Sequence, residues 1–343
     1  MMRAARFDAA TRSLTVRDVP VPEPGPGEVL VRVMACGICL SDVHLLDGTL
    51  PAPLPEVTPG HEAAGVIERV GPGVPPHWQP GQRAVLFAGR VCGECPACAG
   101  GQFEECTNTE IMGFGYDGAW AEFVVVPYVA LAAFGDDLPF EQAAILADAV
   151  ATPYAGLTER AGLRVGQSVG LWGIGGLGVH AVQIARLVGA APIIALDPLL
   201  AARERALALG ADHALDPAAD DIPGTIRELT GGLDLAVDLV GANTVLAQAA
   251  HCLGGGGRLL IIGVSMEPIA LGPAVMFGMA GHSLLGHLGY RKRHLDELIT
   301  LVRTGRLDVS GSISEVLPLE DVARGVEQLA TKKGNPIRLV IRP

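Results

Sequence analysis

The feature that most constrains the fold is an apolar segment that runs directly into a glycine-rich turn. Residues 168–172 read Ser-Val-Gly-Leu-Trp, and the G-x-G-x-x-G run 173–178 and a helical pattern to about Val188 follow. Asp197 stands 19 positions after Gly178, at the end of the next apolar segment. Glycines at this spacing let a backbone approach a pyrophosphate at a helix N-terminus, and the acid binds the ribose 2′-hydroxyl. The pattern predicts a dinucleotide site formed by Gly173, Gly175, Gly176, Leu177, Gly178 and Asp197.

The carboxylate of Asp197 also favours one dinucleotide. It would repel the 2′-phosphate of NADP, so NAD is the expected cofactor. The alternative role for Asp197 is a helix N-cap in front of Pro198.

Strand-like and helical segments alternate through the second half of the chain. Strand candidates lie at 168–172, 193–196, 235–240, 259–264 and 283–288. This alternation predicts an α/β domain with a doubly wound parallel sheet of the Rossmann type. The first third is rich in Pro, Gly and short alternating runs, which predict β-strands at 28–33 and 63–70. Helical patterns and a closing strand follow at 293–304, 319–331 and 337–341.

Four cysteines form the strongest local metal-binding signal. They have the spacing C-x2-C-x2-C-x7-C in a Gly/Pro-rich loop at about 90–107, as Cys92, Cys95, Cys98 and Cys106. Four thiolates this close together suit tetrahedral zinc in a closed structural site. An iron–sulfur cluster is the competing use, but the usual C-x2-C-x2-C-x3-C-P run is absent from the sequence.

A second group of metal-ligand types lies upstream. Cys36-Gly37-Ile38-Cys39-Leu40-Ser41-Asp42-Val43-His44 is followed by Gly60-His61-Glu62. Thiolate, imidazole and carboxylate ligands that leave one position open are what a catalytic zinc site requires. The group therefore predicts a second, catalytic zinc. Taken alone, His61 would be a buried or surface histidine without a ligand role.

Charge and apolar patterning exclude several classes of partner. The formal net charge of −12 is opposite in sign to that of nucleic-acid binders and polybasic membrane proteins, which leaves small molecules as the expected ligands. The first residues lack the apolar run of a secretion signal, which favours a cytoplasmic location. Residues 268–290 lack Asp, Glu, Lys and Arg, but Pro273 and two histidines favour a buried helix, turn and strand over a membrane span. Cys252 is expected to be a small buried residue.

Taken together, the ordered motifs resemble the zinc-dependent alcohol dehydrogenases of the medium-chain dehydrogenase/reductase superfamily. The resemblance implies a GroES-like catalytic domain at 1–148, a Rossmann NAD-binding domain at 149–288 and a C-terminal segment, 289–343, that returns to the catalytic domain. By motif position Cys39 and His61 are catalytic-zinc ligands and Cys36 is not. Glu62 is the neighbouring carboxylate, and Asp42 orients the imidazole from the second shell.

The third ligand departs from the commonest pattern of that family. Asp148 lies six positions before Tyr154, where many relatives have cysteine. A carboxylate is also a zinc ligand, so the resemblance assigns the third position to Asp148; the alternative is a helix cap or salt-bridge partner. The resemblance further implies cofactor contacts for Thr152, near the nicotinamide carboxamide, for Arg338, at the pyrophosphate, and for Val264.

The implied chemistry is reversible, NAD-linked oxidation of a primary or secondary alcohol to an aldehyde or ketone. Zinc lowers the pKa of the alcohol, a hydride passes to nicotinamide, and a proton leaves through Ser41 and His44. Ser41 as a turn residue and His44 as an exposed histidine are the alternative interpretations. The expected walls of the substrate pocket are Leu50, Phe87, Trp120 and Leu288.

Rival functions on the same fold remain open at this point. They are a zinc-independent enone or quinone reductase, a polyol or amino-alcohol dehydrogenase, and a non-enzymatic zinc and nucleotide binder. The apolar stretch 275–288 resembles the edge through which family members pair, so a homodimer or homotetramer is expected.

Overall fold

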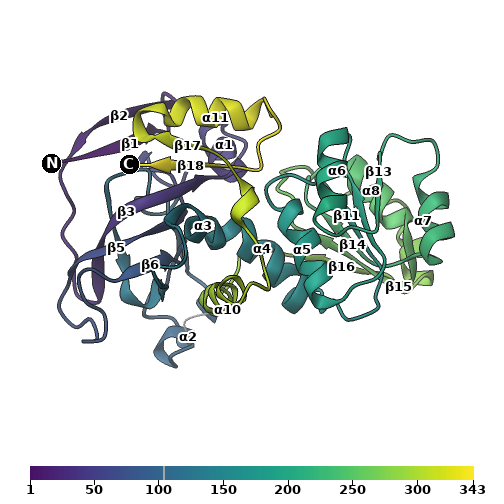
Figure 1. Cartoon of the computed structure of the whole chain (residues 1–343), viewed down its shortest axis with the longest axis horizontal. Helices are drawn as coiled ribbons and strands as arrows, with labels where there is room; N and C mark the ends of the chain where they lie inside the picture. Colours follow the sequence, from purple (N-terminus) through teal and green to yellow (C-terminus); the bar gives the residue numbers. More distant parts are fainter. Residues whose placement is uncertain (103–104) are drawn as a thin grey trace. The chain divides into compact units, whose positions relative to one another are not determined.

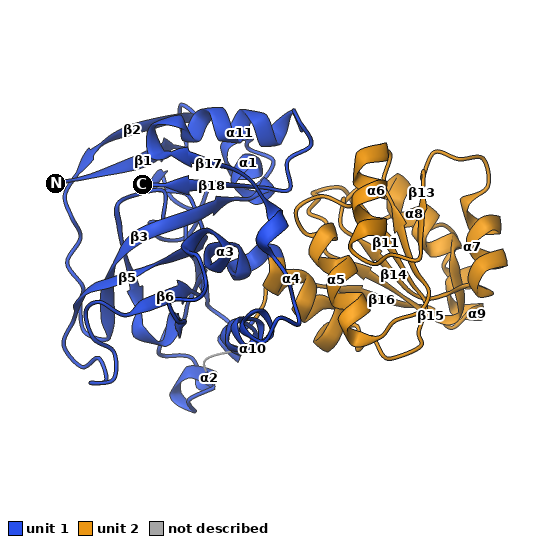
Figure 2. Ribbon diagram, viewed as in Figure 1, with its two compact units in different colours: residues 1–149, 291–343 blue, residues 150–290 orange. Residues whose placement is uncertain are grey.

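The chain folds into two compact units, each of which is described by itself. The computed structural model describes residues 1–102 and 105–343. Unit 1 comprises Met1–Ala149 and Arg291–Pro343, and unit 2 comprises Val150–Tyr290 (Figure 2). Unit 2 is therefore inserted in the sequence of unit 1.

Unit 1 is built on a mixed seven-stranded sheet with the order β10-β6-β5-β3-β18-β17, in which β9 also pairs with β3. A three-stranded sheet β2-β1-β4 and a two-stranded sheet β7-β8 complete it. Figure 1 labels β1 and β2 of the first of these sheets. The strands are β1 (Met2–Asp8), β2 (Ser13–Val19), β3 (Glu28–Ile38), β4 (Glu56–Val57), β5 (Glu62–Val70), β6 (Arg83–Leu86), β7 (Gly89–Arg90), β8 (Glu110–Ile111), β9 (Phe123–Pro127), β10 (Leu131–Ala133), β17 (Ile313–Pro318) and β18 (Arg338–Arg342).

The long strand β3 is the centre of this unit. It pairs with β5, β9 and β18, and its apolar side chains enter a core with those of the neighbouring strands. Because β3 ends at Ile38 and β5 begins at Glu62, the antiparallel pairing brings these ends together through Gly37 and Glu62. The helices of the unit are α1 (Leu40–Asp47), α2 (Pro96–Ala99), α3 (Phe140–Ile145), α10 (Lys292–Arg303) and α11 (Val322–Ala330).

Unit 2 is a parallel six-stranded sheet with the order β13-β12-β11-β14-β15-β16. Its strands are β11 (Val169–Trp172), β12 (Ile193–Leu196), β13 (His213–Leu215), β14 (Leu233–Asp238), β15 (Leu253–Ile261) and β16 (Ser283–Gly286). Its helices are α4 (Ala151–Ala155), α5 (Gly178–Val188), α6 (Leu200–Ala208), α7 (Ile222–Thr230), α8 (Asn243–His251) and α9 (Ala274–Met279). The doubly wound parallel sheet predicted from the sequence is confirmed.

Two predictions for unit 2 need correction. Strand β14 ends at Asp238 rather than at 240, because the chain turns at Gly241, which has a φ of +86°. The helix predicted within 268–290 forms as α9, but none of its residues is buried, and Met279 is 80% exposed. Its apolar side chains lie on the surface of the single chain because the following strand, β16, is at the edge of the sheet. Among the described residues, no helix is both long and apolar enough to cross a membrane.

Candidate metal and nucleotide sites

His61 stands on a segment that the chain fixes by backbone pairing. Gly60 has a φ of +96°, and a Cβ atom there would come within 2.4 Å of the Trp120 indole, so only glycine fits before His61. The Ala119 and Trp120 N–H groups donate to the carbonyls of Gly60 and Pro59 at 2.8 and 3.0 Å. Trp120 is fully buried and its Nε1 donates to the Gly37 carbonyl at 3.3 Å. The expectation that Trp120 lines a substrate pocket is therefore wrong.

Asp42 holds two candidate ligands in place. Cys39 is the N-cap of α1, and its backbone N–H donates to Asp42 Oδ2 at 2.9 Å. The other oxygen of Asp42, Oδ1, lies 3.2 Å from His61 Nδ1. Because Asp42 is fully buried, this contact fixes the imidazole ring with Nε2 directed away from Asp42.

Asp148 reaches the same point from a distorted helical turn. Residues Leu146–Val150 form a π-helical segment in which Asp148 has a φ of +116° and a ψ of −68°. Its Oδ2 lies 3.2 Å from Cys39 Sγ and 3.5 Å from His61 Nε2. The donor atoms of Cys39, His61, Glu62 and Asp148 all lie within 4.8 Å of one another. Thiolate, imidazole and carboxylate donors at this separation fit a zinc ion.

Burial and mutual charge shift the pKa values of these groups. Burial raises the pKa of the Cys39 thiol, and the Asp148 carboxylate raises it further. Burial alone would lower the pKa of His61, but the carboxylates of Asp42 and Asp148 outweigh it and raise that pKa well above its usual value. Burial also raises the pKa of Glu62, whereas the guanidinium of Arg338 favours its ionised form. Without a metal, the cluster therefore retains protons that a cation would displace.

Glu62 faces Arg338 in a buried ion pair. Arg338 begins β18 and is 2% exposed, and its Nη2 lies 3.1 Å from Glu62 Oε1. Arg338 Nη1 donates to the carbonyl of Ile38 at 3.2 Å. Strand β18 therefore places the Arg338 guanidinium against Glu62, one of the donor residues of the cluster. The pyrophosphate contact expected for Arg338 stays a prediction.

Ser41 and His44 both lie on α1, directly after Cys39. Ser41 Oγ is 3.4 Å from His61 Nε2. His44 has a side chain 25% exposed, and its Nδ1 is 3.9 Å from Asp47 Oδ2. One hydroxyl is therefore next to the cluster, and one imidazole on the same helix is partly exposed, with its Nδ1 atom buried.

Phe114 belongs to the site but was not expected from the sequence. Its ring is tilted by 56° to the His61 imidazole, with the centroids 5.7 Å apart. It is half-buried in the turn Gly113-Phe114-Gly115. A large aromatic side chain between two glycines was the only local signal, and nothing in the sequence linked it to His61.

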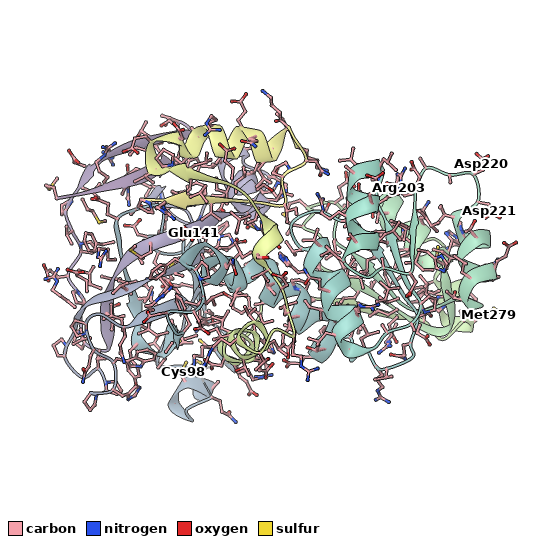
Figure 3. The ribbon with its side chains drawn as sticks, viewed as in Figure 1. Cys98, Glu141, Arg203, Asp220, Asp221 and Met279 are labelled. Carbon is pink, nitrogen blue, oxygen red and sulfur yellow. The ribbon has the colours of Figure 1, made fainter. Side chains whose placement is uncertain are left out.

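The four-cysteine lobe forms a second donor cluster around α2, where Figure 3 labels Cys98. The sulfur atoms of Cys92, Cys95, Cys98 and Cys106 lie within 4.8 Å of one another. A backbone N–H of Cys92 directed at Cys106 Sγ lowers the pKa of Cys106 to about 6. Four sulfur donors at this separation match a tetrahedral zinc site. Cys252 is separate and buried in unit 2, and burial raises its pKa to about 12.

In unit 2 the glycine turn lies between the end of β11 and the start of α5, as the fingerprint requires. Asp197, 8% exposed, accepts the Ile174 N–H on Oδ2 at 2.8 Å and the Leu199 N–H on Oδ1 at 2.9 Å. Asp197 therefore fixes the glycine turn through the Ile174 N–H. Its contact with the ribose stays a prediction. Thr152 is buried on α4, where its carbonyl accepts from His287 Nε2 at 3.0 Å, and Val264 is half-buried after β15.

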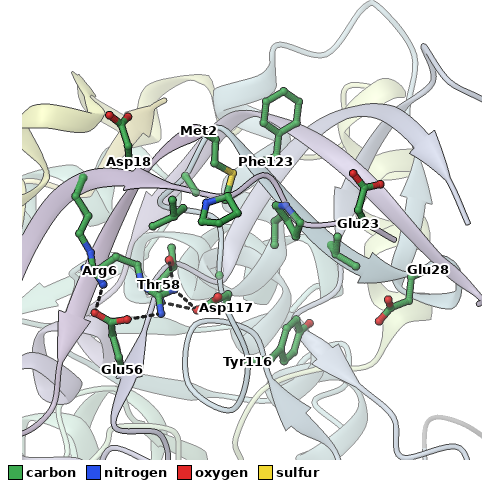
Figure 4. A pocket seen from close by; sticks show the side chains of 18 of the residues that line it. Met2, Arg6, Asp18, Glu23, Glu28, Glu56, Thr58, Tyr116, Asp117 and Phe123 are labelled. Atoms are coloured by element: carbon green, nitrogen blue, oxygen red, sulfur yellow. Dashed lines mark hydrogen bonds and ion pairs between the residues drawn. The ribbon is translucent and has the colours of Figure 1, made fainter. Parts of the chain in front are cut away.

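A separate cavity of about 650 Å³ opens in unit 1. Figure 4 shows Arg6, Glu56, Thr58 and Asp117 gathered at one end of it. Arg6 donates to Thr58 Oγ1 at 3.0 Å, to Asp117 Oδ1 at 2.6 Å and to Glu56 Oε2 at 2.9 Å. Among the described residues that line this cavity, none is a candidate metal ligand. Because Arg6 is paired with Glu56 and Asp117, and Asp117 Oδ1 also accepts the Thr58 N–H at 2.9 Å, this network anchors the start of the segment that leads from Thr58 to His61.

Comparison with known proteins gives this architecture a class. The model of the alcohol dehydrogenase GroES-like domain matches residues 25–136, and the zinc-binding dehydrogenase model matches residues 176–304. These domains define an oxidoreductase of the zinc-binding dehydrogenase type. The chain belongs to the zinc-dependent medium-chain dehydrogenase/reductase family.

Several relatives match nearly the whole chain. An alcohol dehydrogenase of Geobacillus stearothermophilus is 33% identical over 323 residues, which cover 94% of each protein. An L-threonine 3-dehydrogenase of Pyrococcus horikoshii is 32% identical and covers 87% of this chain and 86% of its own. The crystal structure of an NAD-dependent alcohol dehydrogenase has a TM-score of 0.90 at 33% identity, with both chains covered completely. A zinc-binding dehydrogenase of Sinorhizobium meliloti bound to NADP has a TM-score of 0.90 at 30% identity, with 100% of this chain and 99% of its own covered.

Proposed function

We propose that this protein catalyses the reversible, NAD-linked oxidation of an alcohol to an aldehyde or ketone at a zinc site. The observation that carries the proposal is the convergence of Cys39, His61 and Asp148 in unit 1 of a chain whose unit 2 has the dinucleotide fingerprint. These three residues would hold the ion, with Asp42 fixing the imidazole. When bound, zinc supplies Lewis-acid polarisation of the substrate oxygen.

The residues around this cluster define the rest of the proposed site. Ser41, 3.4 Å from His61 Nε2, takes up the proton of the alcohol as its own hydroxyl proton moves toward His44 on the same helix, and His44 releases a proton to solvent. Phe114 provides an apolar wall next to His61, which suits an uncharged substrate carbon chain. Cys92, Cys95, Cys98 and Cys106 hold a second, structural zinc, so we expect two zinc ions per chain.

The proposal for the dinucleotide is NAD, on the basis of Asp197. Its carboxylate lies at the C-terminal end of β12 and is fixed there by two backbone N–H groups. A fixed negative charge at this place disfavours a 2′-phosphate. The NADP-bound relative makes the parallel assay with NADP essential.

The decisive experiment is NADH formation by the zinc-replete enzyme with primary, secondary, aromatic and polyol substrates and with L-threonine. L-threonine belongs in the panel because the threonine dehydrogenase of Pyrococcus horikoshii matches this chain over most of its length. Cys39→Ala is expected to abolish turnover while NADH binding persists. Cys36→Ala is the matched control, because Cys36 is equally buried but is not among the donor atoms of the cluster. Full turnover of Cys39→Ala, or carbonyl reduction that survives chelation, would refute the zinc mechanism.

A further inference from the structure

The carboxylate of Asp238, at the last position of β14, is completely buried without an ion pair among the described residues. Its Oδ1 accepts the N–H groups of Val240 and Gly241 at 2.9 and 3.0 Å, and its Oδ2 lies 3.2 Å from the Gly241 nitrogen. A buried carboxylate is costly unless its acceptors are used, and here the backbone N–H groups of residues 240 and 241 use them.

The backbone of the same residue holds a second segment. The Asp238 carbonyl accepts the N–H groups of Ile262 and Gly263 at 2.9 and 3.0 Å, directly after β15. The two segments touch through their backbones, since a Cβ atom on Gly263 would come within 2.1 Å of the Gly241 nitrogen. Asp238 therefore fastens residues 239–241 to residues 262–264.

These segments lie where an open α/β sheet binds its ligand. The strand order reverses direction between β11 and β14, and ligands bind outside the carboxyl ends of the strands at such a switch point. The Leu239 N–H donates to the Trp172 carbonyl at 3.0 Å. Val240 covers the first fingerprint glycine, because a Cβ atom on Gly173 would lie 2.7 Å from Val240 Cγ2.

We propose that Asp238 is a positioning residue for the dinucleotide: its oxygen atoms hold segments 239–241 and 262–264 in the arrangement that receives the cofactor. It does not touch the reacting atoms. Without the side-chain oxygens, the Val240 and Gly241 N–H groups lose their partners, and segment 239–241 must be ordered again when the cofactor binds, whereas the backbone carbonyl of residue 238 still holds segment 262–264. This inference rests on the proposed dinucleotide dependence.

The test separates the role of the hydrogen-bond acceptor from that of the negative charge at Asp238. Asp238→Asn keeps an oxygen at the place of Oδ1, which holds both N–H groups, so NADH affinity should stay within about threefold of the wild type. Asp238→Leu removes both acceptors and should raise the Kd of NADH about tenfold or more, while kcat at saturating NAD changes by less than about twofold. NADH fluorescence titration of the zinc-loaded enzyme measures the affinity, and steady-state kinetics separate KM from kcat.

Two variants on the same strand control for loss of stability alone. Asp234 lies at the opposite end of β14, where its Oδ2 accepts from the Ser168 N–H and hydroxyl at 2.8 and 2.9 Å. Leu235 is completely buried in β14. Asp234→Leu and Leu235→Ala should lower the melting temperature but leave the Kd of NADH unchanged. If Asp238→Leu does not fold, Asp238→Ala, whose smaller side chain admits water and carries no acceptor, takes its place with the same expected direction.

The outcomes are distinct. NADH affinity that is unchanged in Asp238→Leu or Asp238→Ala, or weakened equally in the two control variants, overturns the positioning role. A large loss of affinity in Asp238→Asn also overturns it, since charge and not the acceptor would then matter. If the wild-type enzyme binds neither NADH nor NADPH, the proposed function fails instead.

Discussion

At the scale of single residues, Asp148 combines a metal-ligand position with a backbone conformation that side chains rarely adopt. Its φ of +116° and ψ of −68° occur where its carboxylate meets Cys39 and His61. Such backbone conformations cost about 1–3 kcal/mol and persist where the surrounding structure imposes them. The backbone strain therefore lies at Asp148, the position where many members of the family have cysteine.

In the metal-free protein, Asp148→Gly is expected to be more stable than Asp148→Ala, because both variants lose the ligand and its contact with His61 but only glycine relieves the backbone strain. Glycine adopts a positive φ without strain, and its greater freedom in the unfolded chain offsets about 0.5–1 kcal/mol of the gain, so a net gain of about 1 kcal/mol over Asp148→Ala is expected. Thermal unfolding after chelation measures it. Asp148→Ala keeps the Cβ atom and therefore the strain, so equal stability of the two variants would contradict the strain.

The affinity of the Cys39 cluster for zinc is expected to rise with pH. The pKa values of Cys39 and His61 are both raised, so in the metal-free protein both groups hold protons that zinc must displace. Lowering the pH therefore favours the protonated, metal-free cluster. Chelator competition at pH 6, 7 and 8, with Cys39→Ala to identify the signal of the four-cysteine lobe, measures this dependence. An affinity that does not change with pH would contradict the assigned ligands.

At the scale of elements, the cavity network around Arg6 is expected to stabilise the segment before His61. Arg6 has a side chain 14% exposed and contacts Glu56, Asp117 and Thr58. Charged hydrogen bonds in such a setting contribute about 1–2 kcal/mol after partial screening by solvent, so Arg6→Gln should lower the free energy of unfolding by that amount.

Arg17→Gln is the matched control for the Arg6 prediction. Arg17 also contacts Glu56, but its side chain is 52% exposed. An exposed pair of this kind contributes about 0–1 kcal/mol. In denaturant unfolding, the free energy of unfolding of Arg6→Gln should therefore be clearly lower than that of Arg17→Gln. Equal effects of the two changes would show that the Arg6 network does not anchor the segment before His61.

The same scale explains what the sequence could and could not predict. The fingerprint glycines and the four cysteines are close in sequence, and their spacing alone determines their geometry, so their elements could be predicted. Glu62 and Arg338 meet only because β18 pairs with β3, and Phe114 meets His61 only through the packing of a turn. Neither the periodicity nor the motif spacing of the sequence predicts these contacts, because they depend on tertiary structure. The four glycines 254–257 were not expected in β15, which contains them at a register shift.

At the scale of the whole molecule, the exposed apolar side chains of 275–288 are the basis for the proposed pairing of two chains. Val275, Met276 and Leu288 are 64%, 62% and 84% exposed. Apolar surface of this kind at a sheet edge is typical of a contact between subunits. We propose a homodimer or a dimer of dimers that buries it.

Met276→Glu is expected to shift the assembly toward a monomer, because a charge would be buried at the proposed contact. Light scattering during size-exclusion chromatography measures the mass. Val165→Glu is the control, since Val165 is 80% exposed elsewhere in unit 2 and its replacement should leave the mass unchanged. A wild-type protein that elutes as a monomer would disprove the pairing.

The insertion of unit 2 within unit 1 has a consequence for the order of synthesis. Residues 150–290 are contiguous and emerge from the ribosome as one uninterrupted stretch, whereas unit 1 cannot be completed until residues 291–343 have been made. The partner of Glu62 is Arg338 on β18, and β18 pairs with β3 through Cys36, Gly37 and Ile38. Until residues 291–343 have been made, the Glu62 carboxylate at the metal cluster has no guanidinium of β18 opposite it. Synthesis of unit 1, which contains the metal cluster, therefore begins before that of unit 2 and is completed after it.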